Sequence, residues 1–301
     1  MRPSLAARVG ELSLVSPILT AAGTAGYGDE LGDYGDLAAL GAVVVKSLAA
    51  FEWAGNPAPR VTAQAGHMVN SVGLAGPGVT AWRERDLPRL RARGATVVAS
   101  VWGRTVEEFA AAAALLAGAD VAAVEVNASC PNLEDRSRIF AHSPSATAEV
   151  VDACRAAGRP LWVKLSPNPP DLGEVASAGL GAGATALVLV NTLLGLAVDV
   201  EARRPALGGL GGGVSGPGIL PVALRAVADC APLGAPVVGV GGVARGEDAI
   251  AMVMAGASAV EVGSATFADP RAPWRVARGV ARWMARHGVA GLDEIRGVAR
   301  A

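Results

Sequence analysis

The sequence has few aromatic residues, few cysteines and no excess of charge of either sign. Phe, Trp and Tyr make up 4% of its 301 residues, and the 26 Lys and Arg nearly balance the 27 Asp and Glu. A near-neutral chain lacks the basic surface that nucleic acid or an anionic membrane attracts. Cys130, Cys154 and Cys230 are an odd, widely spaced set. We therefore expect no disulfide framework, no bound metal and a reducing, cytoplasmic environment.

The sequence also has no long hydrophobic run. Its first residues, MRPSLAARVGELSLVSP, contain no continuous apolar core of the kind found in a signal peptide. No uninterrupted apolar run approaches the roughly 18 residues that a membrane-spanning helix needs. The expectation is a protein that does not associate with membranes.

Short apolar runs recur along the chain, which is 51% hydrophobic and contains 39 glycines. Eight of these runs are apolar along nearly their whole length and do not alternate with polar residues, which is typical of buried parallel strands. Each run is followed by polar or glycine residues. A strand is expected in each of them, at 17–21, 42–45, 96–101, 121–126, 161–163, 186–190, 237–240 and 259–262.

Amphipathic stretches of helical length alternate with these runs. Eight alternating units predict an α/β fold, a (β/α)8 TIM barrel over residues 1–301 as one domain, with long loops at its C-terminal face. A β-hairpin is expected at 5–14, and an open, doubly wound sheet is the alternative to closure. Helices are expected at 34–40, 82–93, 105–117, 144–157, 171–182, 217–229, 245–255 and 270–287.

Polar side chains follow four of the predicted strands directly. They are Lys46, Asn127, Lys164 and Asn191. Because the carboxyl ends of barrel strands share one face, we expect these side chains to meet at one site. A lysine at the end of an apolar run is costly to bury without an anion or another partner, so the pattern indicates a binding site at this face.

The strand at 121–126 ends in the cluster NASCPN, which contains Asn127, Cys130 and Asn132. Carboxamides can hydrogen-bond a planar ligand that carries amide groups, and a thiol between them can move a proton. The alternative is an ordinary turn with a buried, inert cysteine.

Three glycine-rich segments follow or precede predicted elements late in the chain. They are GGGVSGPG at 211–218, GVGGVARGED at 239–248 and EVGSATFADP at 261–270. Glycine lets backbone N–H groups approach a phosphate closely, and the last two βα loops of such barrels often bind phosphate. The three together predict a phosphate-bearing cofactor or substrate, although each alone could be a tight turn.

The motifs EVNASCPN, VKLSPN, VNTLLGLAVDVEARRP, GVSGPGILPVALR, VVGVGGVARGEDA and EVGSATF together resemble the dihydroorotate dehydrogenases, flavin barrels of pyrimidine biosynthesis. The resemblance covers nearly the whole chain and keeps the motif order. It implies one FMN per chain and oxidation of (S)-dihydroorotate to orotate. A cysteine at this position of the SCPN motif resembles the class 1 members of the family. The class that the chain resembles most is 1B, on the segments NTLLGLAVDVEARRP and GGVSGP. In class 1B the catalytic subunit pairs with a second subunit, which carries FAD and an iron–sulfur cluster. This second subunit passes electrons to NAD. A homodimer within a heterotetramer is implied.

The resemblance also implies roles for individual residues. Cys130 would be the base that takes a proton from C5 of dihydroorotate, and Lys164 would face the N1 and O2 edge of the flavin. The substrate would contact Lys46, Asn70, Val72, Gly73, Leu74, Asn127, Asn132, Asn191 and Thr192. The cofactor would contact Ala22, Gly23, Lys46, Ser47, Asn127, Lys164, Val190 and Gly241, with its phosphate on Gly216, Gly242, Gly263 and Ser264.

Two segments depart from the family pattern. Many class 1 members read GLxNxG where this chain reads GLAGPG, so Gly76 replaces an asparagine beside the substrate. The loop after SCPN, LEDRSRIFAHSP, is not glycine-rich, and we expect it to close over the substrate. The alternatives to a class 1B subunit are a homodimeric class 1A enzyme that uses fumarate, a barrel similar to the dihydrouridine synthases, and a non-catalytic barrel subunit.

Overall fold

Eight parallel strands form the central sheet of the computed structural model, which describes residues 3–64, 66–129 and 140–300. Their order in the sheet is β3-β16-β15-β10-β9-β8-β7-β4. Each strand overlaps one of the eight runs predicted from the sequence. The strands are β3 (Ile18–Thr20), β4 (Val43–Val44), β7 (Val97–Val101), β8 (Ala123–Asn127), β9 (Leu161–Leu165), β10 (Ala186–Leu189), β15 (Val237–Val240) and β16 (Ala259–Val262).

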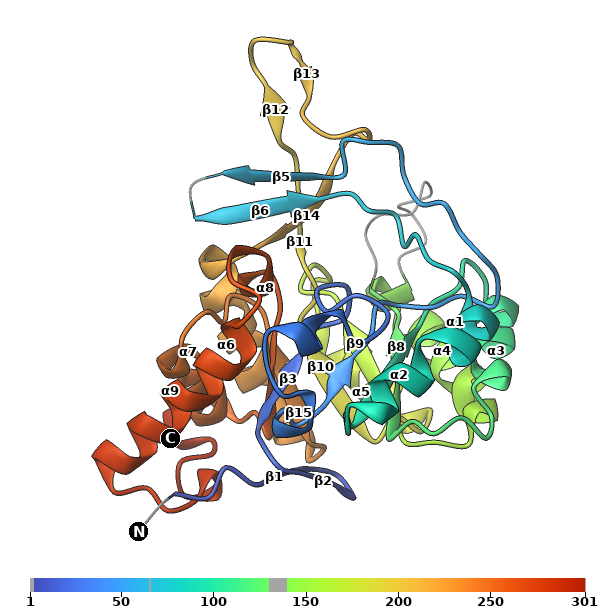
Figure 1. The fold of residues 1–301 in the computed structure, drawn as a ribbon. Coiled ribbons are helices and arrows are strands. Elements are labelled where there is room, and N and C mark those ends of the chain that lie inside the picture. Colours follow the sequence, from blue (N-terminus) through green and yellow to red (C-terminus); the bar gives the residue numbers. More distant parts are fainter. Residues whose placement is uncertain (1–2, 65, 130–139, 301) are drawn as a thin grey trace.

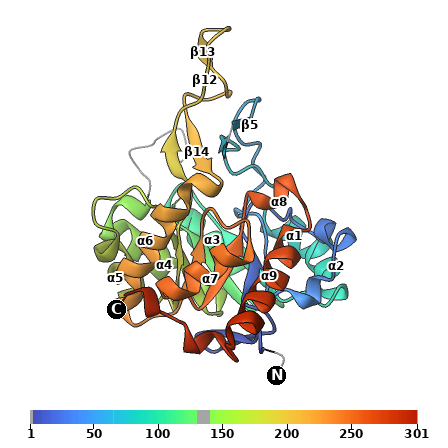
Figure 2. The same ribbon diagram turned by 90° about the vertical axis from the view of Figure 1, so that its left-hand side faces the viewer.

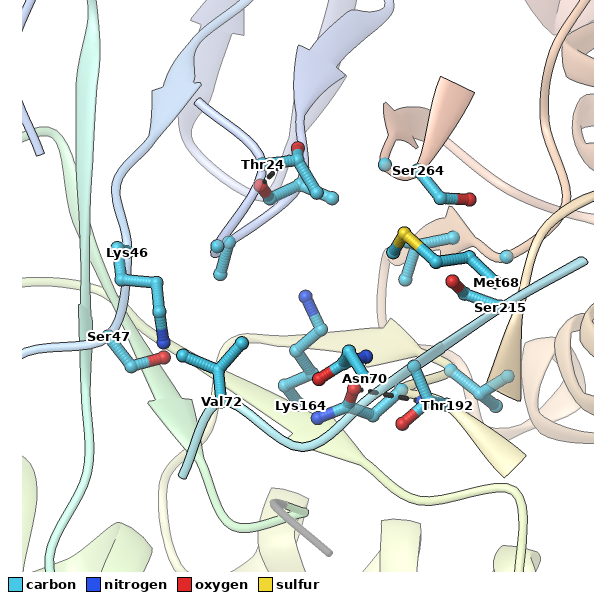
Figure 3. Close-up of a pocket in the computed structure, with 18 of the residues that line it drawn as sticks. Thr24, Lys46, Ser47, Met68, Asn70, Val72, Lys164, Thr192, Ser215 and Ser264 are labelled. Atoms are coloured by element: carbon cyan, nitrogen blue, oxygen red, sulfur yellow. Dashed lines mark hydrogen bonds between the residues drawn. The ribbon is translucent and has the colours of Figure 1, made fainter. Parts of the chain in front are cut away.

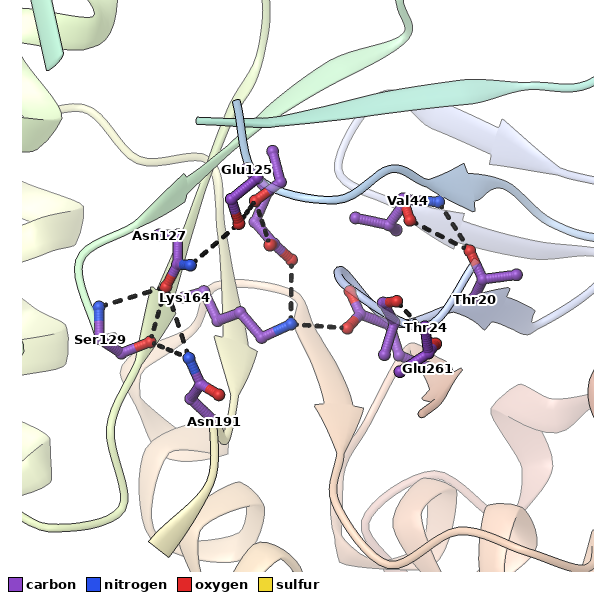
Figure 4. Close-up of polar contacts among 12 residues, drawn as sticks. Thr20, Thr24, Val44, Glu125, Asn127, Ser129, Lys164, Asn191 and Glu261 are labelled. Carbon is purple, nitrogen blue, oxygen red and sulfur yellow. Dashed lines mark hydrogen bonds and ion pairs between the residues drawn. The ribbon is translucent and has the colours of Figure 1, made fainter. Parts of the chain in front are cut away.

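The two end strands of this sheet, β3 and β4, meet and close it. Backbone hydrogen bonds join Thr20 N to Ala42 O (3.2 Å) and Gly41 N to Ile18 O (2.8 Å). The Thr20 hydroxyl completes the seam, because it accepts from Val44 N at 2.9 Å and donates to Val44 O at 3.3 Å (Figure 4). The predicted barrel is confirmed, and the open-sheet alternative is wrong.

Helices surround the barrel (Figures 1 and 2). Several begin where the sequence supplies an N-cap: the side chains of Thr105, Ser143 and Asp171 each accept from a backbone N–H three residues ahead. The helices are α1 (Val79–Arg85), α2 (Leu87–Ala92), α3 (Val106–Leu115), α4 (Pro144–Ala153), α5 (Leu172–Gly181), α6 (Leu220–Cys230), α7 (Gly246–Ala255), α8 (Ala265–Ala268) and α9 (Ala272–His287).

Short 3₁₀ turns connect many of these elements. They lie at Glu30–Asp33, Leu37–Ala39, Phe140–His142, Cys154–Ala157, Pro217–Ile219, Ala231–Leu233, Leu292–Glu294 and Val298–Arg300. None of the helices in the described ranges is long and apolar enough to cross a membrane.

The helix predicted at 34–40 is wrong, since only the turn Leu37–Ala39 forms there. The indole of Trp274 explains the difference. Its N–H donates to Asp36 O at 2.8 Å, the carbonyl that also accepts from Ala39 N in the short turn. The ring also packs against Gly35, where an added Cβ would lie 2.5 Å from it. Tertiary packing therefore overrides the local helical pattern.

A second, antiparallel sheet that the sequence did not predict stands over the carboxyl end of the barrel (Figure 1). Its order is β11-β14-β6-β5, with β5 (Val61–Gln64), β6 (His67–Asn70), β11 (Leu193–Gly195) and β14 (Gly212–Ser215). A two-stranded ribbon, β12 (Val198–Asp199) and β13 (Arg204–Pro205), projects beyond it. The predicted N-terminal hairpin is confirmed as β1 (Ala7–Val9) and β2 (Leu12–Leu14), at the opposite end.

The barrel interior changes from apolar to polar along the strands. Val98, Ala123, Trp162 and Ala259 point inward and are fully buried, and they pack with the hairpin at the amino end. Successive inward positions are two residues apart along a strand. The next inward layer is therefore formed by Ser100, Glu125, Lys164 and Glu261, each also buried. This layer places charge at the carboxyl end of the barrel.

Candidate active site

A pocket opens at the carboxyl ends of the barrel strands, between the barrel and the antiparallel sheet (Figure 3). It brings together most of the residues that the sequence predicted. Gly216 lies in an adjoining cavity that shares Gly242 and Ser264 with this pocket. Cys130, Asn132 and most of the loop after them lie outside the described residues. The predicted residues that line the pocket are Ala22, Gly23, Lys46, Ser47, Asn70, Val72, Gly73, Leu74, Asn127, Lys164, Val190, Asn191, Thr192, Gly241, Gly242, Gly263 and Ser264.

A chain of hydrogen bonds fixes the carboxamides on one side of the pocket. Asn127 donates from Nδ2 to Ser47 Oγ at 3.0 Å, and its Oδ1 accepts from Ser129 Oγ at 3.1 Å. Asn191 donates from Nδ2 to Ser129 Oγ at 2.9 Å. Both amide groups therefore have a fixed orientation, which prearranges them for a ligand with donors and acceptors.

A buried charge cluster lies beside these amides (Figure 4). Lys164 Nζ lies 3.0 Å from Glu261 Oε2 and 3.5 Å from Glu125 Oε2. Ser100 donates to Glu125 Oε1 at 2.8 Å and contacts Ser47 Oγ at 2.9 Å. The cluster is thus connected to Asn127 and to the pocket through these serines.

Two carboxyl groups face one ammonium group in this cluster, so full ionisation would leave one buried negative charge without a counter-ion. Burial, with a further contribution from Glu125, raises the pKa of Glu261 to about 8, against the opposing effect of Lys164. Glu261 Oε1 also has no hydrogen-bond partner among the described residues. The pKa of Lys164 is raised: burial lowers it, but the two carboxyl groups outweigh burial. The lysine remains an ammonium group, and Glu261 retains its proton near neutral pH.

Lys46, the second lysine of the pocket, extends into it from the segment that follows β4. Its stem packs on Gly23, where an added Cβ would lie 3.3 Å from Lys46 Cδ, and the φ of Gly23 is +89°. Figure 3 shows the Lys46 side chain extending past Ser47 toward Val72. Two ammonium groups from different strands thus line one pocket.

The wall opposite the barrel is a tight turn that follows β6. Gly73 and Leu74 both have left-handed backbone conformations, with φ values of +69° and +62°. Trp53 supports this turn by donating from its indole to Gly73 O at 2.9 Å. Beside it, Asn70 donates to Gly213 O on β14 at 3.2 Å. The antiparallel sheet therefore positions this wall.

The far end of the pocket is formed by the glycine-rich segments. Gly242 has a φ of +78°, and an added Cβ would lie 2.6 Å from Leu220 N. Ser215 lines the same end, and its buried Oγ has no partner within the described part of the chain. A crowded backbone with a positive φ, which favours glycine, and an unsatisfied hydroxyl beside it fit a phosphate-bearing group.

The sequence reasoning did not identify several residues of this pocket. Met68 and Val61 lie on the antiparallel sheet, whose strands are too short for a clear periodic signal. The signal for the buried cluster was present, because Glu125 and Glu261 interrupt otherwise apolar runs at inward positions. The other lining residues that were not predicted are Ala21, Thr24, Ser215, Ile219, Val240, Val243 and Phe267.

A closed barrel with a polar pocket at the carboxyl ends of its strands defines a (β/α)8-barrel enzyme. A sequence profile described as dihydroorotate dehydrogenase matches residues 4–284. The chain belongs to the dihydroorotate dehydrogenase family and is an oxidoreductase.

Three curated relatives show how close this similarity is. One from Trichlorobacter lovleyi is 44% identical over 300 residues, 99% of each chain. One from Alkaliphilus metalliredigens is 43% identical over 291 residues, 96% of each chain. One from Geobacter sulfurreducens is 42% identical over 299 residues, 98% of each chain. All three are named dihydroorotate dehydrogenase B (NAD(+)), catalytic subunit, which agrees with the class 1B resemblance.

Proposed function

We propose that this chain is the FMN-dependent catalytic subunit that oxidises (S)-dihydroorotate to orotate in de novo synthesis of pyrimidine nucleotides. The observation that carries the proposal is the convergence of two ammonium groups, oriented carboxamides and glycine-rich turns on one pocket. The near full-length similarity to the class B relatives supports it.

FMN fits the residues that line this pocket. The glycine-rich turns around Gly242 and Gly263, with Ser264 and the unsatisfied Ser215 hydroxyl, would hold its phosphate. Lys164 would supply the positive charge that a reduced flavin requires near N1. Bound FMN would supply the acceptor for the hydride that leaves C6 of the substrate. Val190, Ser47 and the Ala22–Gly23 segment would line the ring.

The substrate would occupy the side of the pocket nearest the carboxamides. Dihydroorotate is an anion with ring amide groups, which suits Lys46 for the carboxylate and Asn127 and Asn191 for the ring. The hydrogen bonds that already orient these two amides reduce the entropy lost on binding. Asn70, Thr192 and the turn from Val72 to Leu74 would complete the enclosure.

Cys130 is proposed as the base that removes the proton from C5. The thiolate is the active form, and a free cysteine with a pKa of about 8.5 is only a few per cent ionised at neutral pH. The rate of substrate oxidation is therefore expected to rise with pH. Cys130→Ser should slow anaerobic flavin reduction by at least about a hundredfold, with FMN content unchanged. Undiminished reduction in this variant would remove the base assignment.

Electrons would leave through a partner subunit that carries FAD and an iron–sulfur cluster, with NAD as the final acceptor. We propose a homodimer of this chain within a heterotetramer in the cytoplasm. The words "catalytic subunit" and "NAD(+)" in the names of its relatives support a partner subunit and NAD as the acceptor. The alternative is a class 1A enzyme that passes electrons to fumarate.

Acceptor specificity distinguishes these alternatives. The purified chain should reduce an artificial dye with dihydroorotate but reduce neither fumarate nor NAD at a useful rate. Adding the co-expressed iron–sulfur flavoprotein should give NAD reduction. Rapid fumarate reduction by the chain alone would contradict the class 1B assignment.

A further inference from the structure

The Tyr27 hydroxyl occupies the space beside Gly76, where the family pattern has an asparagine side chain. A Cβ added at Gly76 would lie 3.1 Å from Tyr27 Cζ and closer still to the hydroxyl oxygen. That hydroxyl donates to Ala75 O, the carbonyl next to Gly76. The Tyr27 hydroxyl and any side chain at position 76 therefore compete for one volume.

This contact joins two walls of the pocket that are far apart in the sequence. Tyr27 follows the segment Ala21–Thr24, which lines the cofactor side. Ala75 follows the turn Val72–Leu74, which lines the substrate side. Trp82 holds Tyr27 in place by donating from its indole to Tyr27 O at 2.7 Å.

The turn that follows β6 is held by hydrogen bonds to several of its carbonyl groups. Val72 O accepts from Asn56 N at 3.1 Å, and Gly76 O accepts from Trp53 N at 2.9 Å. Between them, the Trp53 indole donates to Gly73 O and the Tyr27 hydroxyl donates to Ala75 O. Burial, with a further contribution from Asp86, raises the pKa of Tyr27, so the hydroxyl keeps its proton and remains a donor throughout the working pH range.

We propose that Tyr27 and Gly76 are a matched pair that positions the Val72–Leu74 turn and thereby sets affinity for the substrate. Tyr27 is a positioning residue, because it acts through the turn and does not line the pocket. The proposal rests on the proposed function, since the turn forms the substrate wall only if the pocket binds dihydroorotate.

Three variants of the full chain test the pair: Tyr27→Phe, Gly76→Asn and the double variant. The readouts are the dissociation constant of orotate, from the absorbance change of bound flavin, and the separate values of KM and kcat. The only other tyrosine, Tyr34, is half exposed and supplies a matched control as Tyr34→Phe.

Tyr27→Phe should weaken orotate binding and raise KM for dihydroorotate about five- to tenfold, with kcat nearly unchanged, because one hydrogen bond to the turn is lost. Gly76→Asn should weaken binding or fail to fold, since its side chain meets the hydroxyl. The double variant should fold and bind within about threefold of the original chain, because the amide replaces the missing hydroxyl. Tyr34→Phe should change neither quantity.

The proposal is overturned if Tyr27→Phe binds orotate normally. It is also overturned if the losses of the two single variants simply add, or if the double variant stays as impaired as Gly76→Asn. In each of these three cases the original chain would still contain FMN and oxidise dihydroorotate. An original chain that takes up no FMN would overturn the proposed function, and this inference with it.

Discussion

Replacing Glu261 by glutamine tests the buried charge cluster beneath the pocket. The carboxyl of Glu261 lies 3.0 Å from Lys164 Nζ and is fully buried, and Glu125 shares the same ammonium group. Glutamine keeps the shape and a hydrogen-bond acceptor for the lysine but has no proton to lose. The variant should therefore fold normally and respond differently to pH.

The sign of the effect follows from the raised pKa of Glu261. An unfolded chain releases this proton near its ordinary pKa of 4.5, whereas the folded chain holds it until about pH 8. As pH rises between these values, the original chain loses stability relative to Glu261→Gln, and above about pH 8 the difference stays constant. Each pKa unit corresponds to about 1.4 kcal/mol, so the interval from 4.5 to about 8 corresponds to a relative loss of about 5 kcal/mol.

Urea unfolding of both chains from pH 5 to pH 9 measures this difference. The free energies of unfolding should be similar at pH 5 and diverge as pH rises, with Glu261→Gln the more stable. Glu84→Gln, at an exposed position on α1, is the control and should follow the original chain. A constant difference between the original chain and Glu261→Gln across this range would refute the reasoning.

Three further substitutions test other parts of the account. Lys164→Met leaves two buried carboxyl groups without their counter-ion, so it should cost about 3–5 kcal/mol at pH 8 and less at pH 5, measured by urea unfolding. Thr20→Val removes the hydroxyl that bridges to both backbone groups of Val44, and it should lower the free energy of unfolding by about 1–3 kcal/mol in the same assay. Gly242→Ala should abolish FMN uptake, measured as flavin per chain. Gly234→Ala should not, although it has a similar φ of +83°, because a Cβ there meets nothing within 4 Å.

The barrel could be predicted from the sequence because its strands are buried on both sides. Such strands are continuous apolar runs, and their polar ends mark where each strand meets the active face. The pattern of runs and polar ends is therefore sufficient to assign Lys46, Asn127, Lys164 and Asn191 to that face. The order of the strands follows from their alternation with helices.

The antiparallel sheet and the buried carboxyl groups could not be predicted in the same way. Strands such as Gly212–Ser215 are short and glycine-rich, and they form by pairing with β11 on one side and with β6, far away in the sequence, on the other. Glu125 and Glu261 stand out in the sequence as carboxyl groups within apolar runs, but no local pattern reveals that Lys164 from a third strand meets both of them. The segment 34–40 shows the converse, because the distant indole of Trp274 packs against its Gly35 and only the short turn Leu37–Ala39 forms.

Anaerobic titration of the purified chain with (S)-dihydroorotate tests the central claim most directly. The protein should be yellow with one FMN per chain, and its flavin absorbance should bleach as one equivalent of orotate forms for each flavin reduced. A folded chain that takes up no FMN, or one whose bound FMN stays oxidised in the presence of dihydroorotate, would contradict this claim.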